Sequence, residues 1–264
     1  MEPRHHPTLL SLAEAEDFPD SGKRMARLAS LSSPVTGARA SNVNYFGAAR
    51  CRHKFQLYYP NGFDDDVYQV AERSVKERAH LEWSTELNPS AFRRLLARGD
   101  HGRIVDIVLR IESRCNLLFS FEKMALRDAV KAVPDARTFA TALYAFLYGR
   151  GSPQRKFDAW LAALDSLPRR KSRVLSWPLV TVFAQIARPD LHVFLKPVVT
   201  RKAARAYGYA FDYSPTPCWP VYRDLLTFAA VLRRDLDRKP GFRAQDMIDI
   251  QSFIWVQGSA EYER

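Results

Sequence analysis

The residues best suited to chemistry in this chain are cations, and they are concentrated in one stretch. Residues 150–205 contain twelve Lys and Arg against three Asp, so about a fifth of the chain carries +9 of the total net charge of +11. Grouped cations neutralise nucleic-acid phosphates and release condensed counterions, which makes binding sensitive to salt. The charge pattern therefore predicts a phosphate-binding surface, and a merely solvated basic surface is the alternative.

Two groups of cations stand out within this stretch. One is a basic connector that follows Pro168. The other is a helix expected over residues 197–207, in which Arg201 and Arg205 share a face with Lys202 beside them and no acidic residue lies within the helix. We predict that DNA is the partner and that eight cations contact it: Arg169, Arg170, Lys171, Arg173, Lys196, Arg201, Lys202 and Arg205.

A second pattern surrounds Asp190. Leu167-Pro168 is followed by the basic connector, an apolar helix and the segment Pro189-Asp190-Leu191-His192-Val193-Phe194. Asp190 follows Pro168 by 22 positions. Over residues 167–194 this arrangement resembles the central region of helix–hairpin–helix DNA glycosylases, in which a glycine-rich hairpin binds phosphate through backbone amides. The resemblance also implies an all-helical architecture.

The resemblance implies base-excision chemistry centred on Asp190. Breaking an N-glycosidic bond passes through an oxocarbenium-like sugar, which a carboxylate stabilises while it orients or deprotonates water. The base would be extruded into a pocket, where Trp177, Tyr207 or Trp219 could stack on it. Residues 169–173 contain no glycine, so cationic side chains would replace the backbone amides of the hairpin. Taken alone, Asp190 is better interpreted as a turn or helix-capping residue.

Two further sets of polar residues have helical spacing. Glu72, Lys76 and His80 share one face, where general acid–base work is conceivable because His titrates near neutral pH, but an ordinary Glu–Lys pair beside a surface His is favoured. Asp246 and Asp249 could bind a cation or a basic helix. The favoured interpretation is that both carboxylates stabilise the first turn of a helix.

Other function classes have no support in the sequence. It contains no phosphate-binding loop, no dinucleotide fingerprint and no serine-hydrolase elbow, so we expect no nucleotide cofactor. The six His and three Cys show no metal-ligand spacing, so we expect no metal. No apolar run is long enough for a membrane span, and we expect a cytoplasmic protein of the bacterial cytosol or nucleoid. The oligomeric state stays open.

Helix-period apolar patterns separated by Pro and Gly predict an all-α, compact multi-helix globular fold. We predict a disordered leader at residues 1–52 and a single all-helical domain at residues 53–264, in which residues 53–150 and 151–264 could form two packed lobes. Asn116 is the expected N-cap of one helix, and Pro134 is its expected end. Helices are predicted over residues 64–87, 89–98, 103–113, 117–133, 137–148, 153–167, 177–187, 197–207, 221–236 and 244–256.

Taken together, the sequence predicts a DNA-binding helical protein, with glycosylase-like removal of a modified or damaged base as the finer prediction. The alternative is a non-enzymatic helical protein whose basic surface binds nucleic acid or an acidic protein partner.

Overall fold

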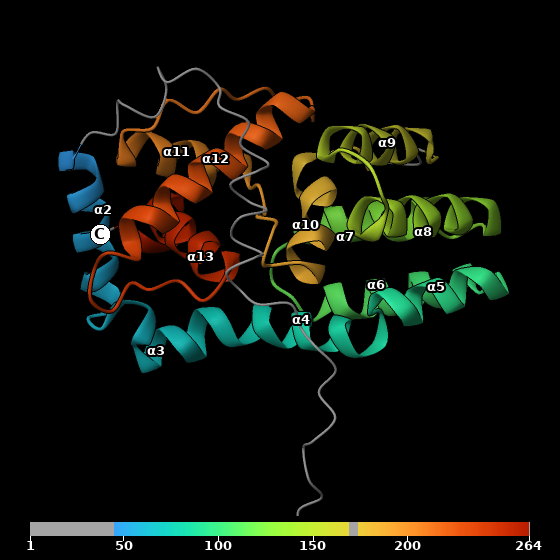
Figure 1. Ribbon diagram of the computed structural model, residues 1–264, viewed down its shortest axis with the longest axis horizontal. Coiled ribbons are helices and arrows are strands. Elements are labelled where there is room, and N and C mark those ends of the chain that lie inside the picture. Colours follow the sequence, from blue (N-terminus) through green and yellow to red (C-terminus); the bar gives the residue numbers. More distant parts are fainter. Residues whose placement is uncertain (1–44, 169–173, 264) are drawn as a thin grey trace, which may run out of the picture. The chain divides into compact units, whose positions relative to one another are not determined.

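The fold is described by a computed structural model over residues 45–168 and 174–263. All of these residues belong to one compact unit. Their regular secondary structure is helical throughout, with no strand in the described ranges, which confirms the predicted all-α fold (Figure 1). Within these ranges no helix combines the length and the apolar character that crossing a bilayer would require.

The described helices follow one another with short connectors. In chain order they are α2 (Tyr45–Tyr58), the 3₁₀ turn η2 (Gly62–Asp64), α3 (Asp66–Tyr68), the π-helical turn η3 (Gln69–Arg73), α4 (Ser74–Glu86), α5 (Pro89–Arg98), α6 (His101–Ser113), α7 (Ser120–Ala129), α8 (Val133–Tyr148), α9 (Pro153–Ser166), α10 (Trp177–Ala187), α11 (Pro197–Tyr207), α12 (Trp219–Leu236), α13 (Met247–Gly258) and the 3₁₀ turn η4 (Ala260–Tyr262).

Helix α2 corrects the predicted end of the leader. Residues 45–52 were expected to be disordered, yet they form the first half of this helix. Ala48, Cys51 and Phe55 are buried at helical spacing, so α2 has an apolar face that packs on α11 and α13. Gly47 permits the close approach, because a Cβ there would lie 2.7 Å from the carbonyl oxygen of Tyr207.

The boundary between α7 and α8 also differs from the prediction. Helix α7 begins at Ser120, with Phe119 rather than Asn116 at the N-cap position, and the backbone N–H of Phe119 donates to the Glu122 carboxylate at 2.8 Å. Pro134 does not end a helix but lies in the first turn of α8, where its missing N–H has no intrahelical role.

Helix α10 is the centre of the fold, and every one of its residues is buried. It lies between α8 and α9 on one side and α12 and α13 on the other (Figure 1). Two of its polar side chains hold the extended segment that leads into α11. Thr181 Oγ1 accepts from the backbone N–H of Leu195 at 3.0 Å, and Gln185 Oε1 accepts from that of Phe194 at 3.0 Å. The start of α11 is thereby fixed against the core.

Helix α11 buries one face against α13 and α2. Val199, Ala203 and Tyr207 lie on that face, and a Cβ added at Gly258 of α13 would overlap the Val199 carbonyl group. Because the buried residues repeat at helical spacing, the intervening Arg201 and Arg205 face outward. The packing of α11 therefore decides which of its cations can reach a ligand.

Candidate anion-binding surface on α11

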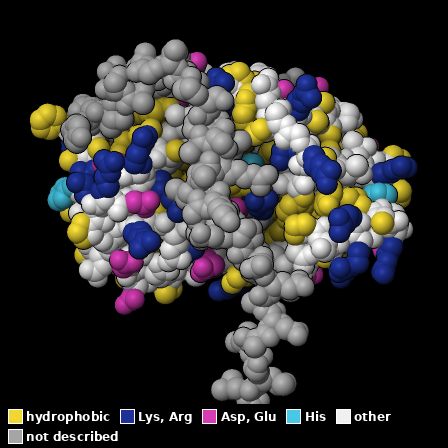
Figure 2. All heavy atoms as spheres, in the orientation of Figure 1, with side chains coloured by type: hydrophobic (Ala, Val, Ile, Leu, Met, Phe, Trp, Pro, Cys, Tyr) yellow, Lys and Arg dark blue, Asp and Glu magenta, His cyan; other side chains and the backbone are white. Residues whose placement is uncertain are grey.

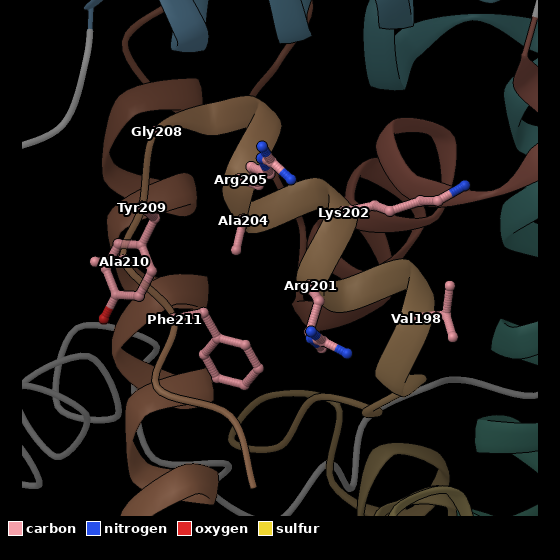
Figure 3. Close-up of a pocket in the computed structure, with 9 residues that line it drawn as sticks. All are labelled: Val198, Arg201, Lys202, Ala204, Arg205, Gly208, Tyr209, Ala210 and Phe211. Atoms are coloured by element: carbon pink, nitrogen blue, oxygen red, sulfur yellow. The ribbon is translucent and has the colours of Figure 1, made fainter. Parts of the chain in front are cut away.

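An open hollow of about 660 Å³ lies beside the outward face of α11. One side is formed by the helix and the other by residues 208–211, which leave its C-terminus (Figure 3). No Asp or Glu is among the described residues that line it, which are Val198, Arg201, Lys202, Ala204, Arg205, Gly208, Tyr209, Ala210 and Phe211. The hollow therefore combines cations with aromatic rings.

The two arginines lie one helical turn apart and form no ion pair with any described residue. The Arg201 guanidinium lies 5.1 Å from the centroid of the Tyr213 ring, a cation–π contact that leaves its N–H donors available. Lys202 differs, because its Nζ lies 2.8 Å from a carboxylate oxygen of Glu263. Arg201 and Arg205 are therefore the cations of this hollow that an anion can engage without displacing a carboxylate.

The opposite wall is anchored to α12. The chain leaves α11 at Gly208, whose φ of 83° is in the left-handed region that favours glycine. The Tyr209 hydroxyl donates to one oxygen of the Asp224 carboxylate at 2.8 Å, and the backbone N–H of Asp212 donates to the other at 2.9 Å. Phe211 lies between these two anchors, and its ring points into the hollow (Figure 3).

Helix α2 adds cations that sequence reasoning missed. Arg50 is exposed, and Lys54 Nζ lies 3.4 Å from the Gln257 carbonyl oxygen. The ion pair with Lys202 and the charge of Lys54 lower the pKa of the Glu263 carboxyl, so one cation of α11 and one of α2 act on the same carboxylate. Figure 2 shows Lys and Arg side chains, with carboxylates among them, where Figure 1 places α2. The i, i+4 spacing of Arg50 and Lys54 was the available signal, but the predicted boundary between leader and domain fell between the two residues.

Lys196 does not belong to this surface, and its predicted contact with nucleic acid is wrong. Its side chain is buried: Nζ donates to the Leu117 carbonyl oxygen at 3.2 Å, lies 3.7 Å from a Glu122 carboxylate oxygen and sits 3.3 Å from the centroid of the Phe119 ring. Burial lowers the pKa of this ammonium. Through these contacts the Lys196 ammonium group links α7, and the segment just before it, to the start of α11.

The other predicted cations do not all gather with Arg201 and Arg205. Residues Arg169, Arg170, Lys171 and Arg173 lie outside the described residues. Arg155 and Lys156 lie in the first turn of α9, and Arg150 lies in the connector before it. Helix α9 lies on the other side of α10 from α11 (Figure 1). The described cations of residues 150–205 therefore do not converge into one face, because the chain passes through the core between its two basic segments.

Asp190 does not line the hollow. It lies in the turn that follows α10, where its two carboxylate oxygens accept from Nε and Nη2 of Arg188, each at 3.1 Å. His192 Nδ1 is hydrogen-bonded to the Tyr222 hydroxyl at 2.9 Å, and burial lowers the pKa of this imidazole to about 3. His192 is therefore neutral near pH 7. The role of Asp190 in catalysis stays a prediction. In the structure its carboxylate forms a bidentate ion pair with the nearby Arg188.

Two of the three predicted base-stacking aromatics are core residues. Trp177 is 2% exposed, and its indole N–H donates to the Ser214 carbonyl oxygen at 2.7 Å. Tyr207 is fully buried, and its hydroxyl donates to Asp235 at 2.8 Å. Only Trp219 is partly exposed, at the start of α12. Because a ring packed on both faces cannot accept a base, the prediction is wrong for Trp177 and Tyr207.

The remaining polar sets are parts of a buried network. The Asp249 carboxylate accepts from the Tyr68 hydroxyl at 2.6 Å and from Arg73 Nη1 at 2.8 Å, so α13 does bind a cation of a neighbouring helical turn. Lys76 Nζ donates to Glu72 at 2.7 Å and is buried, whereas His80 Nδ1 is hydrogen-bonded to a backbone carbonyl group. Tyr68, Arg73 and Lys76 therefore join α3, η3 and α4 to α13, whereas His80 joins α4 to Ile186 of α10.

Comparison with known proteins adds no constraint. No protein-family model, curated protein or solved structure matches the chain. Among the described residues, no group of three or more His, Cys, Asp or Glu could hold a metal ion. The chemistry of the exposed side chains is therefore the basis for inferring a function.

Proposed function

We propose that this protein binds nucleic acid, with DNA as the expected polymer, through the basic surface formed by α11 and α2. The observation that carries the proposal is the pair Arg201 and Arg205, which line one hollow whose described lining residues include no carboxylate. Guanidinium groups match phosphate geometry through paired N–H donors, and they stay charged at all relevant pH values.

Two further features support binding to a polyanion. The chain has a net charge of +11, which attracts polyanions at long range. Arg50 and Lys54 extend the cationic surface from α11 onto the neighbouring helix α2. A backbone-tracking polymer can engage cations on both helices, whereas a small anion would engage only one or two of them.

Base excision is not the function that this geometry favours. Asp190 lies away from the hollow, and its carboxylate is bound by Arg188. Trp177 and Tyr207 are unavailable for stacking. We therefore propose a binding protein, and the glycosylase-like activity stays a prediction whose direct test is the formation of alkali-labile sites in damaged DNA by wild type but not by Asp190→Asn.

The test of binding is a fluorescence-polarisation titration with a short labelled DNA duplex at about 50 and about 200 mM salt. Wild type should bind at low salt and lose affinity steeply at high salt. Arg201→Glu with Arg205→Glu should weaken binding at low salt by at least about tenfold, because two phosphate contacts become repulsive.

A matched control comes from α5. Arg94 and Arg98 are also exposed, lie one turn apart near the end of a helix and form no ion pair with a described residue. Arg94→Glu with Arg98→Glu changes the net charge by the same amount and should weaken binding by less than about threefold. The proposal is overturned by absent wild-type binding, or by equal losses in the two double variants.

A further inference from the structure

The hollow beside α11 has two chemically different walls. Arg201 and Arg205 form the cationic wall, and Phe211 contributes an aromatic ring to the other. Its volume of about 660 Å³ lies within the range of pockets that hold small organic groups. A nucleotide presents the same two chemistries, a phosphate and a flat base, at adjacent positions. The hollow can therefore engage both parts of one nucleotide unit.

The Phe211 ring is presented by a fixed backbone. The backbone N–H of Phe211 donates to the Tyr209 carbonyl oxygen at 3.0 Å. The tyrosines two positions before and after it are also held by contacts. The Tyr209 ring stacks on Phe228 with 4.8 Å between centroids, and the Tyr213 ring contacts Arg201. A ring that is held in place loses little conformational entropy when a ligand stacks on it. Phe211 is itself only partly buried, so part of its surface remains available.

The cationic wall is likewise positioned before a ligand arrives. The Arg201 guanidinium contacts the Tyr213 ring, and Arg205 lines the same wall one helical turn later. Figure 3 shows the two arginines along α11, with Arg201 nearer to Phe211 and Arg205 nearer to Gly208, and both line the hollow. Phosphates that lie along α11 would therefore place their attached base toward the aromatic wall.

From this arrangement we infer that the hollow selects single-stranded nucleic acid, in which an unpaired base stacks on Phe211 while its flanking phosphates bind Arg201 and Arg205. This inference rests on the nucleic-acid binding proposed above. Bases within a duplex cover one another's faces, so Phe211 can stack only on a base that has left the helix or was never paired. Stacking on aromatic side chains is tolerant of sequence because every base has a π face.

The experiment compares a labelled single-stranded oligothymidine with a duplex of equal length, by fluorescence polarisation at low salt. Wild type should bind the single strand more tightly. Phe211→Ala should weaken single-strand binding by about tenfold while changing duplex binding by less than about twofold, because only the unpaired base uses the ring. Phe211→Trp should retain the preference, since a larger ring still stacks.

Two further variants are controls for effects on folding. Phe211→Leu keeps an apolar side chain that can pack on its neighbours but has no aromatic face, so it should lose single-strand affinity as Phe211→Ala does. Phe121→Ala removes an exposed ring on α7, outside the hollow, and should leave both affinities unchanged. Thermal unfolding of each variant identifies any general destabilisation.

The outcomes separate this inference from the proposed function. If wild type binds neither polymer, nucleic-acid binding itself is wrong. If wild type binds the duplex at least as tightly as the single strand, or if Phe211→Leu binds the single strand as wild type does, stacking on Phe211 is excluded while binding through the arginines stands.

Discussion

Helices α5 and α11 are built alike but differ in what they can bind. Each has a proline in its first turn, and each carries a pair of exposed arginines one turn apart, of which the second lies in the last turn; α5 has Arg93 beside this pair, and α11 has Lys202. Each ends at a glycine in the left-handed conformation, with φ of 74° at Gly99 and 83° at Gly208. The local sequence therefore gives no reason to assign a site to one helix and not to the other.

The segments that come after the two helices make the difference. After Gly99 the chain turns directly into α6, which begins at His101, so the residues that follow the cap continue as a helix. After Gly208 it continues as an extended aromatic segment that is anchored to α12 and forms the second wall of a hollow. A pair of arginines becomes a candidate site only where the tertiary structure supplies groups that complete it.

The two helices also begin differently. At the start of α5, the Asn88 side chain accepts from the backbone N–H of Ala91 at 2.9 Å, which is an ordinary N-cap. At the same position of α11, Lys196 makes no cap and instead buries its ammonium beside Glu122 and Phe119. The start of α11 is therefore stabilised by tertiary contacts and the start of α5 by a local one.

The largest effect is expected on the free energy of unfolding, from substitutions at the N-terminal ends of α5 and α11. Lys196→Met should lower the free energy of unfolding by about 3 kcal/mol, because it leaves the buried Glu122 carboxylate without its cation. Asn88→Ala should lower it by only about 1 kcal/mol. Urea denaturation of the two variants measures both values, and similar losses would show that the burial of Lys196 contributes no more than a cap.

The second-largest effect is expected on the salt dependence of DNA binding, which should differ between variants of the two arginine pairs. Arg201→Gln with Arg205→Gln should reduce the slope of log affinity against log salt for a DNA duplex by about two, because two phosphate contacts release fewer counterions. Arg94→Gln with Arg98→Gln should leave the slope unchanged. A similar reduction in both would mean that binding follows total charge rather than the α11 surface.

The smallest effect is expected at the shared glycine caps. Gly99→Ala and Gly208→Ala should each lower the free energy of unfolding by about 1 kcal/mol, because an L side chain is strained at these positive φ values. Only Gly208→Ala should also weaken nucleic-acid binding, since the wall of the hollow begins there. Equal binding by the two variants would indicate that the wall tolerates displacement.

Local interactions let the sequence determine most of the helices. Pro89, Pro153 and Pro197 mark helix starts, and Gly99 and Gly208 mark helix ends, where the structure has them, because caps and φ restraints act within a few residues. The outward face shared by Arg201 and Arg205 follows from helical spacing alone. Helix α2 was missed although Ala48, Cys51 and Phe55 carried the same kind of signal, because the surrounding composition suggested a leader.

Tertiary structure decided which of the candidate residues are available for binding. Lys196, Tyr207 and Trp177 are buried, and their polar partners Glu122, Asp235 and Ser214 lie far away in the sequence. The sequence pattern did not indicate Phe211 as a candidate, because its ring can contribute to a binding site only when α11 forms the opposite wall of the hollow. A periodic pattern gives the face of a helix, but only the packing of distant segments determines whether that face meets solvent, a core or a hollow.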